Sequence, residues 1–155
     1  MIKAVIFDMY GVIINPEQGI FSGQEKPFPE VIVLIEKLSH KLTLGLVSSA
    51  PRSDVEAVLK EFGIEKYFKK TVSGNDVSHN KPDPEPYLLM AQKLELQPGE
   101  CVVIEDSASG VHSAKVAGMH CIGITTTHTR ENLKAADLII NNFREITEEV
   151  IIGLR

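Results

Sequence analysis

The stretch Ala4-Val5-Ile6-Phe7-Asp8-Met9-Tyr10-Gly11 places an acidic residue directly after a short apolar run, close to the start of the chain. A continuous apolar run of this length is typical of a strand that is buried on both faces of a parallel sheet. The run is too short for the hydrophobic core of a signal peptide, and it ends in an acid. We therefore expect Ala4–Phe7 to form a buried strand with Asp8 at its carboxyl end.

Similar apolar runs recur along the chain and alternate with amphipathic segments. Further buried strands are predicted at Leu42–Val47, Cys101–Ile104, Met119–Ile124 and Leu138–Ile140, with a short one at Thr71–Gly74. Apolar residues three and four positions apart predict helices around Val31–Leu38, Val55–Phe62, Tyr87–Leu94, Val111–Ala117 and Phe143–Ile151. This alternation predicts an α/β fold, a Rossmann-like three-layer α/β/α sandwich with a parallel sheet.

The size and composition of the chain indicate an ordinary globular protein. A length of 155 residues suits one domain, and 43% hydrophobic with 24% charged residues is typical of soluble proteins. The net charge of −5, with no basic cluster, argues against a nucleic-acid or anionic-membrane surface. No apolar run approaches the roughly 20 residues of a membrane-spanning helix. We expect a soluble, cytoplasmic protein with neither nucleic-acid nor membrane partners.

The cysteines and histidines do not predict a site of their own. Cys101 and Cys121 each begin an apolar run, so we expect two buried thiols and no disulfide. The five histidines have no metal-ligand spacing, and we interpret them as surface or loop residues.

One segment departs from the strand–helix pattern. Residues Asn15–Lys26 contain several turn formers and no sustained period, between the first predicted strand and the first predicted helix. We interpret this segment as a short flap over the site. Residues 1–155 would otherwise form a single domain without a cap domain.

Polar residues follow the predicted strands at the points where they end. Asp8 follows the first strand, Ser48 and Ser49 the second, and the pair Glu105–Asp106 the fourth, while Lys81 falls in the loop before the third helix. Ligands on parallel sheets bind beyond the carboxyl ends of the strands. We therefore expect these side chains to gather at one edge of the sheet.

Such a set is suited to phosphoryl transfer. Converging carboxylates repel one another unless they are protonated or bind a cation, and all-oxygen donors suit Mg²⁺. The cation would neutralise phosphoryl oxygens so that anionic Asp8 can attack, and Lys81 would add positive charge beside it. The Ser48 hydroxyl and helix N-terminal amides would hold the phosphoryl group. An aspartyl-phosphate would form and then be hydrolysed.

The chain also resembles a known family in four signatures that occur in the right order. Together they resemble the motifs of haloacid dehalogenase-like hydrolases, in the branch of the phosphatases and β-phosphoglucomutases. The matching segments are Val5–Ile13, Val47–Ser49, Lys81–Pro84 with Tyr87, and Ile104–Gly110, and Gly123–Thr129 with Ala136–Asp137 is similar to the tail of these proteins.

The resemblance implies a role for each residue of the metal site. Asp8 would be the nucleophile and a ligand of Mg²⁺, and Asp106 would be a second ligand. Glu105 would either bind the ion directly or contact the residues that bind it. Tyr10 would contribute only its backbone carbonyl.

The resemblance also implies which residues bind the phosphoryl group. Ser48, Ser49 and Lys81 would hold it, and Lys81 would stabilise the anionic intermediate. The substrate would be a phosphorylated small molecule or an exposed phosphate on a macromolecule.

Tyr10 departs from the pattern of the family's phosphatases, which carry a second aspartate at this position as general acid and base. Tyrosine, with an ordinary pKa near ~10, is a poor base at neutral pH, and loss of such a group typically costs about 10²–10⁴-fold in rate. We expect a slow phosphatase. Tyrosine here also resembles the 2-haloacid dehalogenases, but Glu105 and Asp106 would repel a haloacid in the absence of metal.

The predicted absence of a cap leaves two further possibilities. An open site admits bulk water, a macromolecular substrate or a neighbouring copy of the chain, so a homo-oligomer is one option. Tyr10 also allows a protein that binds phosphate or a partner without turnover.

Overall fold

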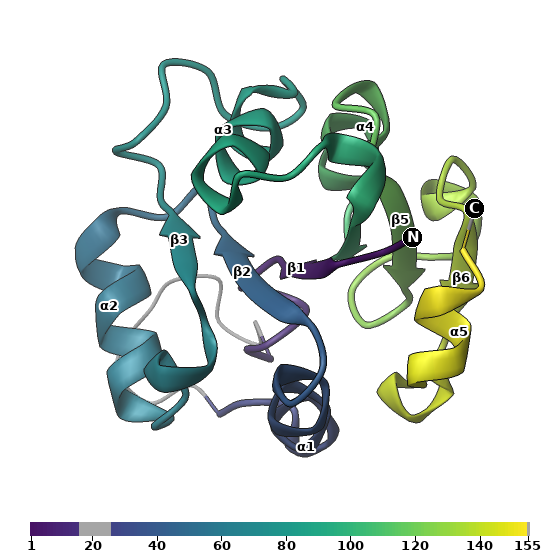
Figure 1. Ribbon diagram of the computed structural model, residues 1–155, viewed down its shortest axis with the longest axis horizontal. Helices are drawn as coiled ribbons and strands as arrows, with labels where there is room; N and C mark the ends of the chain where they lie inside the picture. Colours follow the sequence, from purple (N-terminus) through teal and green to yellow (C-terminus); the bar gives the residue numbers. More distant parts are fainter. Residues whose placement is uncertain (16–25, 155) are drawn as a thin grey trace.

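A parallel sheet of six strands runs through the computed structural model, which describes residues 1–15 and 26–154. The strand order is β3-β2-β1-β4-β5-β6 (Figure 1). The strands are β1 (Ala4–Phe7), β2 (Thr43–Val47), β3 (Lys70–Val72), β4 (Cys101–Glu105), β5 (His120–Ile124) and β6 (Leu138–Ile140). This architecture is the predicted Rossmann-like α/β fold.

Helices cover both faces of the sheet. They are α1 (Pro29–Ser39), α2 (Arg52–Glu61), α3 (Glu85–Leu94), α4 (Ala108–Val116) and α5 (Glu148–Ile152). Short 3₁₀ turns lie at η1 (Glu65–Tyr67), η2 (Pro98–Glu100), η3 (Glu131–Leu133) and η4 (Phe143–Glu145). Figure 1 shows α3 and α4 on one side of the sheet and α1, α2 and α5 on the other. Within the described residues no cap domain is present.

The central strand β1 explains why its sequence is apolar without interruption. Val5 and Phe7 pack into the core beneath α1 and α2, whereas Ala4 and Ile6 pack into the core beneath α3 and α4. All four side chains are fully buried. A strand that is buried on both faces cannot alternate apolar with polar residues, so a continuous apolar run results.

The strand order places the site at a particular point of the sheet. The chain builds β2 and β3 on one side of β1, then crosses back and builds β4, β5 and β6 on the other. Phe7 is therefore in register with both Leu46 of β2 and Ile104 of β4. The next residues, Asp8, Val47 and Glu105, lie side by side at the reversal point where α/β folds bind ligands.

Most predicted elements agree with the structure to within a few residues, but the last helix does not. The single helix expected over Phe143–Ile151 is split into η4 and α5, because Ile146 is extended and Thr147 caps α5 by accepting a hydrogen bond from the Val150 amide at 3.2 Å. The short strand predicted at Thr71–Gly74 begins one residue earlier and ends at Val72.

The predicted flap lies outside the described residues except at its two ends. There the Asn15 amide donates a hydrogen bond to the Lys26 carbonyl at 3.1 Å. No helix in the described part of the chain is long and apolar enough to cross a membrane.

Candidate active site

The polar residues that follow the strands line one pocket of about 330 Å³ at the carboxyl edge of the sheet. Asp8 follows β1, Ser48 follows β2 and Asp106 follows β4, while Lys81 reaches the pocket from the loop between β3 and α3. The lining residues are Asp8, Tyr10, Ser48, Ser49, Ala50, Lys81, Asp106, Ser107 and Ser109. Glu105 does not line this pocket and is completely buried.

Lys81 forms two buried ion pairs at the centre of the site. Its Nζ donates to Oδ1 of Asp8 at 2.8 Å and to Oε1 of Glu105 at 2.7 Å, with the lysine side chain only 7% exposed. Burial opposes the lysine's charge, but the carboxylates of Asp8 and Glu105 outweigh it and raise the pKa of Lys81 above its ordinary value. Lys81 is therefore a permanent positive charge beside Asp8.

The protein satisfies both carboxylate oxygens of Glu105. Oε1 accepts hydrogen bonds from Lys81 and from the buried Tyr87 hydroxyl at 2.6 Å, and Oε2 accepts one from the Asp106 amide at 3.2 Å. Gly110 packs so closely that an added Cβ would lie 2.0–2.1 Å from the carboxyl group. Glu105 is therefore better placed to hold Lys81 in position than to bind a ligand in the pocket.

The carboxylates of Asp8 and Asp106 lie close together and are both largely buried. Burial, and then the Asp106 carboxylate, raise the pKa of Asp8 from its ordinary 3.8 to about 7, although Lys81 opposes the rise. Burial also raises the pKa of Asp106. One oxygen each of Asp8, Glu105 and Asp106 lies within 4.8 Å of the others. A divalent cation would offset the repulsion between these carboxylates, and the all-oxygen donor set fits Mg²⁺.

The turn after Asp8 requires a glycine. Gly11 has a positive φ of 84°, and an added Cβ would lie 1.9 Å from Oδ2 of Asp106. The turn that follows β1 can therefore approach the carboxylate that follows β4. Tyr10, one residue earlier, is partly buried and lines the pocket.

The opposite side of the pocket is neutral. Ser48 is buried, and its Oγ accepts a hydrogen bond from the Ala50 amide at 3.1 Å. The loop after β3 holds this segment, because the Gly74 amide donates to the Ala50 carbonyl at 2.8 Å. The Arg52 amide donates to Oδ1 of Asn75 at 2.7 Å. These bonds fix the backbone that would surround a phosphoryl group.

Sequence reasoning did not assign several residues that the structure brings to the site. Tyr87 was part of a quoted motif, but its contact with Glu105 follows from the packing of α3. Thr126 and Thr127, in the loop after β5, contact Gly11 and Asp106. Both lie just beyond a predicted strand end and within the segment Gly123–Thr129 that resembles the family, but neither signal indicated a contact with the site. Ser107 and Ser109 line the pocket from the start of α4.

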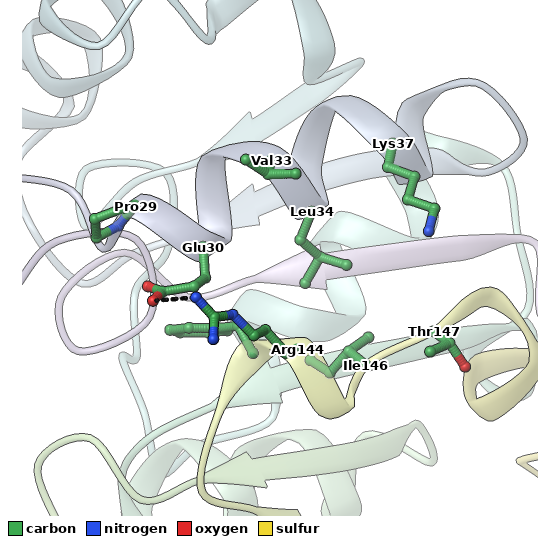
Figure 2. Close-up of a pocket in the computed structure, with 9 residues that line it drawn as sticks. Pro29, Glu30, Val33, Leu34, Lys37, Arg144, Ile146 and Thr147 are labelled. Atoms are coloured by element: carbon green, nitrogen blue, oxygen red, sulfur yellow. Dashed lines mark ion pairs between the residues drawn. The ribbon is translucent and has the colours of Figure 1, made fainter.

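A second, larger pocket of about 420 Å³ lies between α1 and the segment that contains η4 (Figure 2). Pro29, Val33, Leu34 and Ile146 supply apolar walls. Glu30 and Arg144 form an ion pair of 3.7 Å across it. No buried carboxylate or lysine converges on this pocket among the described residues, so the smaller pocket is the one equipped for chemistry.

Comparison with known proteins agrees with this geometry. A family model described as haloacid dehalogenase-like hydrolase matches residues 21–124. The chain belongs to this family. The chain also shares its fold with CbbY from Rhodobacter sphaeroides, solved in complex with phosphate, which superimposes with a TM-score of 0.85 at 21% identity, over 99% of this chain and 100% of that one.

Two curated relatives extend the comparison within the haloacid dehalogenase-like hydrolases. Validoxylamine A 7'-phosphate phosphatase of Streptomyces hygroscopicus is 37% identical over 106 residues, which are 68% of this chain and 50% of the relative. Phosphoglycolate phosphatase of Salmonella choleraesuis is 33% identical over 146 residues, 91% of this chain and 55% of the relative. The chain thus spans about half the length of the curated relatives it matches.

Proposed function

We propose that this haloacid dehalogenase-like protein hydrolyses phosphate monoesters of small molecules, through an aspartyl-phosphate on Asp8 and with Mg²⁺. The observation that carries the proposal is the buried pair of Asp8 with Lys81 next to a second carboxylate, Asp106. The phosphatases among its relatives support the same reaction class. Residues 1–155 would act as one catalytic domain.

The residues around Asp8 favour the first step, its attack on phosphorus. Lys81 holds Oδ1 of Asp8, which leaves Oδ2 to form the new bond to phosphorus. The bond to the leaving oxygen breaks at the same time, and that oxygen takes its proton from solvent water. When bound by Asp8, Asp106 and the backbone carbonyl of Tyr10, Mg²⁺ would neutralise charge on the phosphoryl oxygens. Ser48, Ser49 and the amides at the start of α2 would bind these oxygens from the neutral side.

Glu105 acts on Lys81 in this proposal. Because both of its carboxylate oxygens already accept hydrogen bonds from the protein, it is better placed to hold Lys81 than to bind the cation. Lys81 then remains charged while Asp8 changes from carboxylate to acyl phosphate.

Hydrolysis of the intermediate is the weak step. Water must lose a proton when it attacks phosphorus, and Tyr10 stands where the family's phosphatases carry an aspartate. The phenol, with an ordinary pKa near ~10, is protonated at neutral pH and cannot take that proton. We expect slow turnover, about 10²–10⁴-fold below that of a phosphatase with a positioned acid and base.

The test is release of phosphate from p-nitrophenyl phosphate with Mg²⁺, by the parent, Asp8→Asn and Tyr10→Asp. We expect no turnover by Asp8→Asn, slow turnover by the parent and a gain for Tyr10→Asp. Unchanged turnover in Asp8→Asn would exclude Asp8 as the nucleophile. An absence of gain in Tyr10→Asp would show that something other than Tyr10 limits the rate.

Tyr10 alone favours a second candidate, hydrolysis of 2-haloacids, because a halide leaves without a proton. Burial raises the pKa of both Asp8 and Asp106, and the Asp106 carboxylate adds to the rise at Asp8. An anionic haloacid would meet these two crowded carboxylates, which disfavours the reaction. Release of chloride from 2-chloropropionate in the presence of EDTA would favour dehalogenation. Binding of phosphate with no turnover of any ester would favour a non-catalytic binding protein.

A further inference from the structure

The loop after β5 contacts the site at two points. The Thr126 hydroxyl donates a hydrogen bond to the backbone carbonyl of Gly11, in the turn after Asp8. The Thr127 hydroxyl donates to Oδ2 of Asp106 at 2.5 Å. Two consecutive threonines of one loop therefore hold both the turn that follows β1 and the carboxylate that follows β4.

The two oxygens of the Asp106 carboxylate have different surroundings. Oδ2 accepts the Thr127 hydrogen bond and also lies against Gly11, where an added Cβ would come within 1.9 Å of it. Glu105 differs, because hydrogen bonds from the protein occupy both of its oxygens. Oδ2 of Asp106 is thus the oxygen that Thr127 and Gly11 hold in place.

The ring of His128 also contacts the Thr127 hydroxyl. Its Nδ1 lies 2.7 Å from Oγ1 of Thr127. A hydroxyl has a single proton, so if Thr127 donates to Asp106, then His128 must donate to Thr127 from a protonated Nδ1. The chain of bonds runs from His128 through Thr127 to Asp106.

We propose that Thr127 is a positioning residue of the metal centre, which holds Oδ2 of Asp106 so that Oδ1 is presented to the cation. The inference rests on the proposed function, because it takes Asp106 as a metal ligand. It adds a third loop, the one after β5, to the loops after β1 and β4. Partners that orient metal ligands typically contribute about 10–100-fold to metal affinity.

The test is the affinity for Mn²⁺ without substrate, measured from the electron paramagnetic resonance signal of the free ion. Thr127→Val keeps the side chain's shape and removes the hydroxyl, and Thr127→Ser keeps the hydroxyl. Thr125→Val is the matched control, since the Thr125 hydroxyl bonds Asn141 on the surface at 2.9 Å. We expect Thr127→Val to bind Mn²⁺ about 10–100-fold more weakly, with Thr127→Ser and Thr125→Val close to the parent.

Two results would overturn the proposal: Mn²⁺ affinity of Thr127→Val equal to that of the parent, or an equal loss in Thr125→Val. Melting temperatures in EDTA exclude a general loss of structure, because Thr127→Val is expected to melt with the parent when no cation is present.

Failure of the proposed function gives a different pattern. If the parent binds Mn²⁺ and only Thr127→Val is weakened, but Asp8→Asn still hydrolyses p-nitrophenyl phosphate, then Thr127 positions Asp106 and Asp8 is not the nucleophile. If the parent binds no Mn²⁺ at millimolar concentration, both proposals are wrong.

Discussion

The two sides of the pocket are built in different ways. On one side Asp8, Lys81, Glu105 and Asp106 are buried ionisable groups that contact one another. On the other side Ser48 is neutral, and hydrogen bonds of the backbone hold its loop. We call them the charged side and the neutral side.

The charged side and the neutral side should respond differently to the loss of a side chain. Removal of one member from the charged side leaves a partner buried and uncompensated, which is costly. The neutral side loses single hydrogen bonds of about 0.5–1.5 kcal/mol when a side chain is truncated, because the backbone amides remain. Substitutions on the charged side should therefore change both stability and chemistry, and those on the neutral side chiefly affinity.

The largest effect is expected for Lys81→Met. The methionine has a similar length but leaves Asp8 and Glu105 without their shared cation, and both are buried. Loss of one partner from a buried ion pair costs about 3–5 kcal/mol. Denaturant unfolding should show a loss of this size, together with loss of turnover. Lys134→Met is the control, because the ion pair of Lys134 with Glu131 is exposed, and its free energy of unfolding should change little. Equal losses of stability in the two variants would show that the buried pair is no more important than an exposed one.

The pH dependence of stability tests the charged side without removal of Lys81. The pKa of Asp8 is raised from 3.8 to about 7 on folding, so its contribution to stability is full below pH ~4 and is lost as the pH rises through about 7. Without a cation, the parent should lose stability relative to Asp8→Asn over this range, and Mg²⁺ should remove most of the loss. Melting temperatures in EDTA and in Mg²⁺ measure this difference, and parallel curves for the two proteins would show that Asp8 does not titrate as described.

A smaller effect is expected on the neutral side from Ser48→Ala. The change removes one buried hydroxyl and keeps the amides of the loop, so phosphate affinity should fall by about tenfold or less. Stability should change by no more than about 1.5 kcal/mol. Competitive inhibition by inorganic phosphate measures the affinity. A loss as large as that of Lys81→Met would mean that the neutral side carries more of the chemistry than its geometry indicates.

The smallest effect is expected for Arg52→Ala. Arg52 pairs with Asp76 at the base of the neutral side, but its side chain is 55% exposed. Exposed pairs contribute about 0–1 kcal/mol, and the hydrogen bond from the Arg52 amide to Asn75 remains. Unfolding and turnover should stay close to those of the parent. A strong loss of substrate affinity would instead assign Arg52 to substrate binding.

The sequence predicted the fold, and the strand ends that Asp8 and Ser48 follow, for a physical reason. Strands buried on both faces must be apolar, so their ends are visible where the first polar residue follows, as at Asp8 and Ser48. The break between η4 and α5 was not predicted, because Ile146 fits the apolar period of a helix although its backbone is extended.

Contacts between distant loops were beyond the reach of the sequence. Thr127 contacts Asp106 from 21 residues away. Tyr87 meets Glu105 only because α3, which packs on β2 and β3, covers the same face of the sheet. The burial and hydrogen bonding of the Glu105 carboxylate likewise depend on contacts with Lys81 and Gly110, which no local sequence pattern encodes.

The central claim is that Asp8 accepts the phosphoryl group and releases it slowly. The most direct test is rapid acid quenching of the protein with p-nitrophenyl phosphate and Mg²⁺, followed by borohydride reduction and peptide mass spectrometry. The account predicts a burst of p-nitrophenol close to one equivalent and conversion of Asp8 to homoserine, absent in Asp8→Asn. Turnover without any modification of Asp8, or with the modification at another residue, would contradict it.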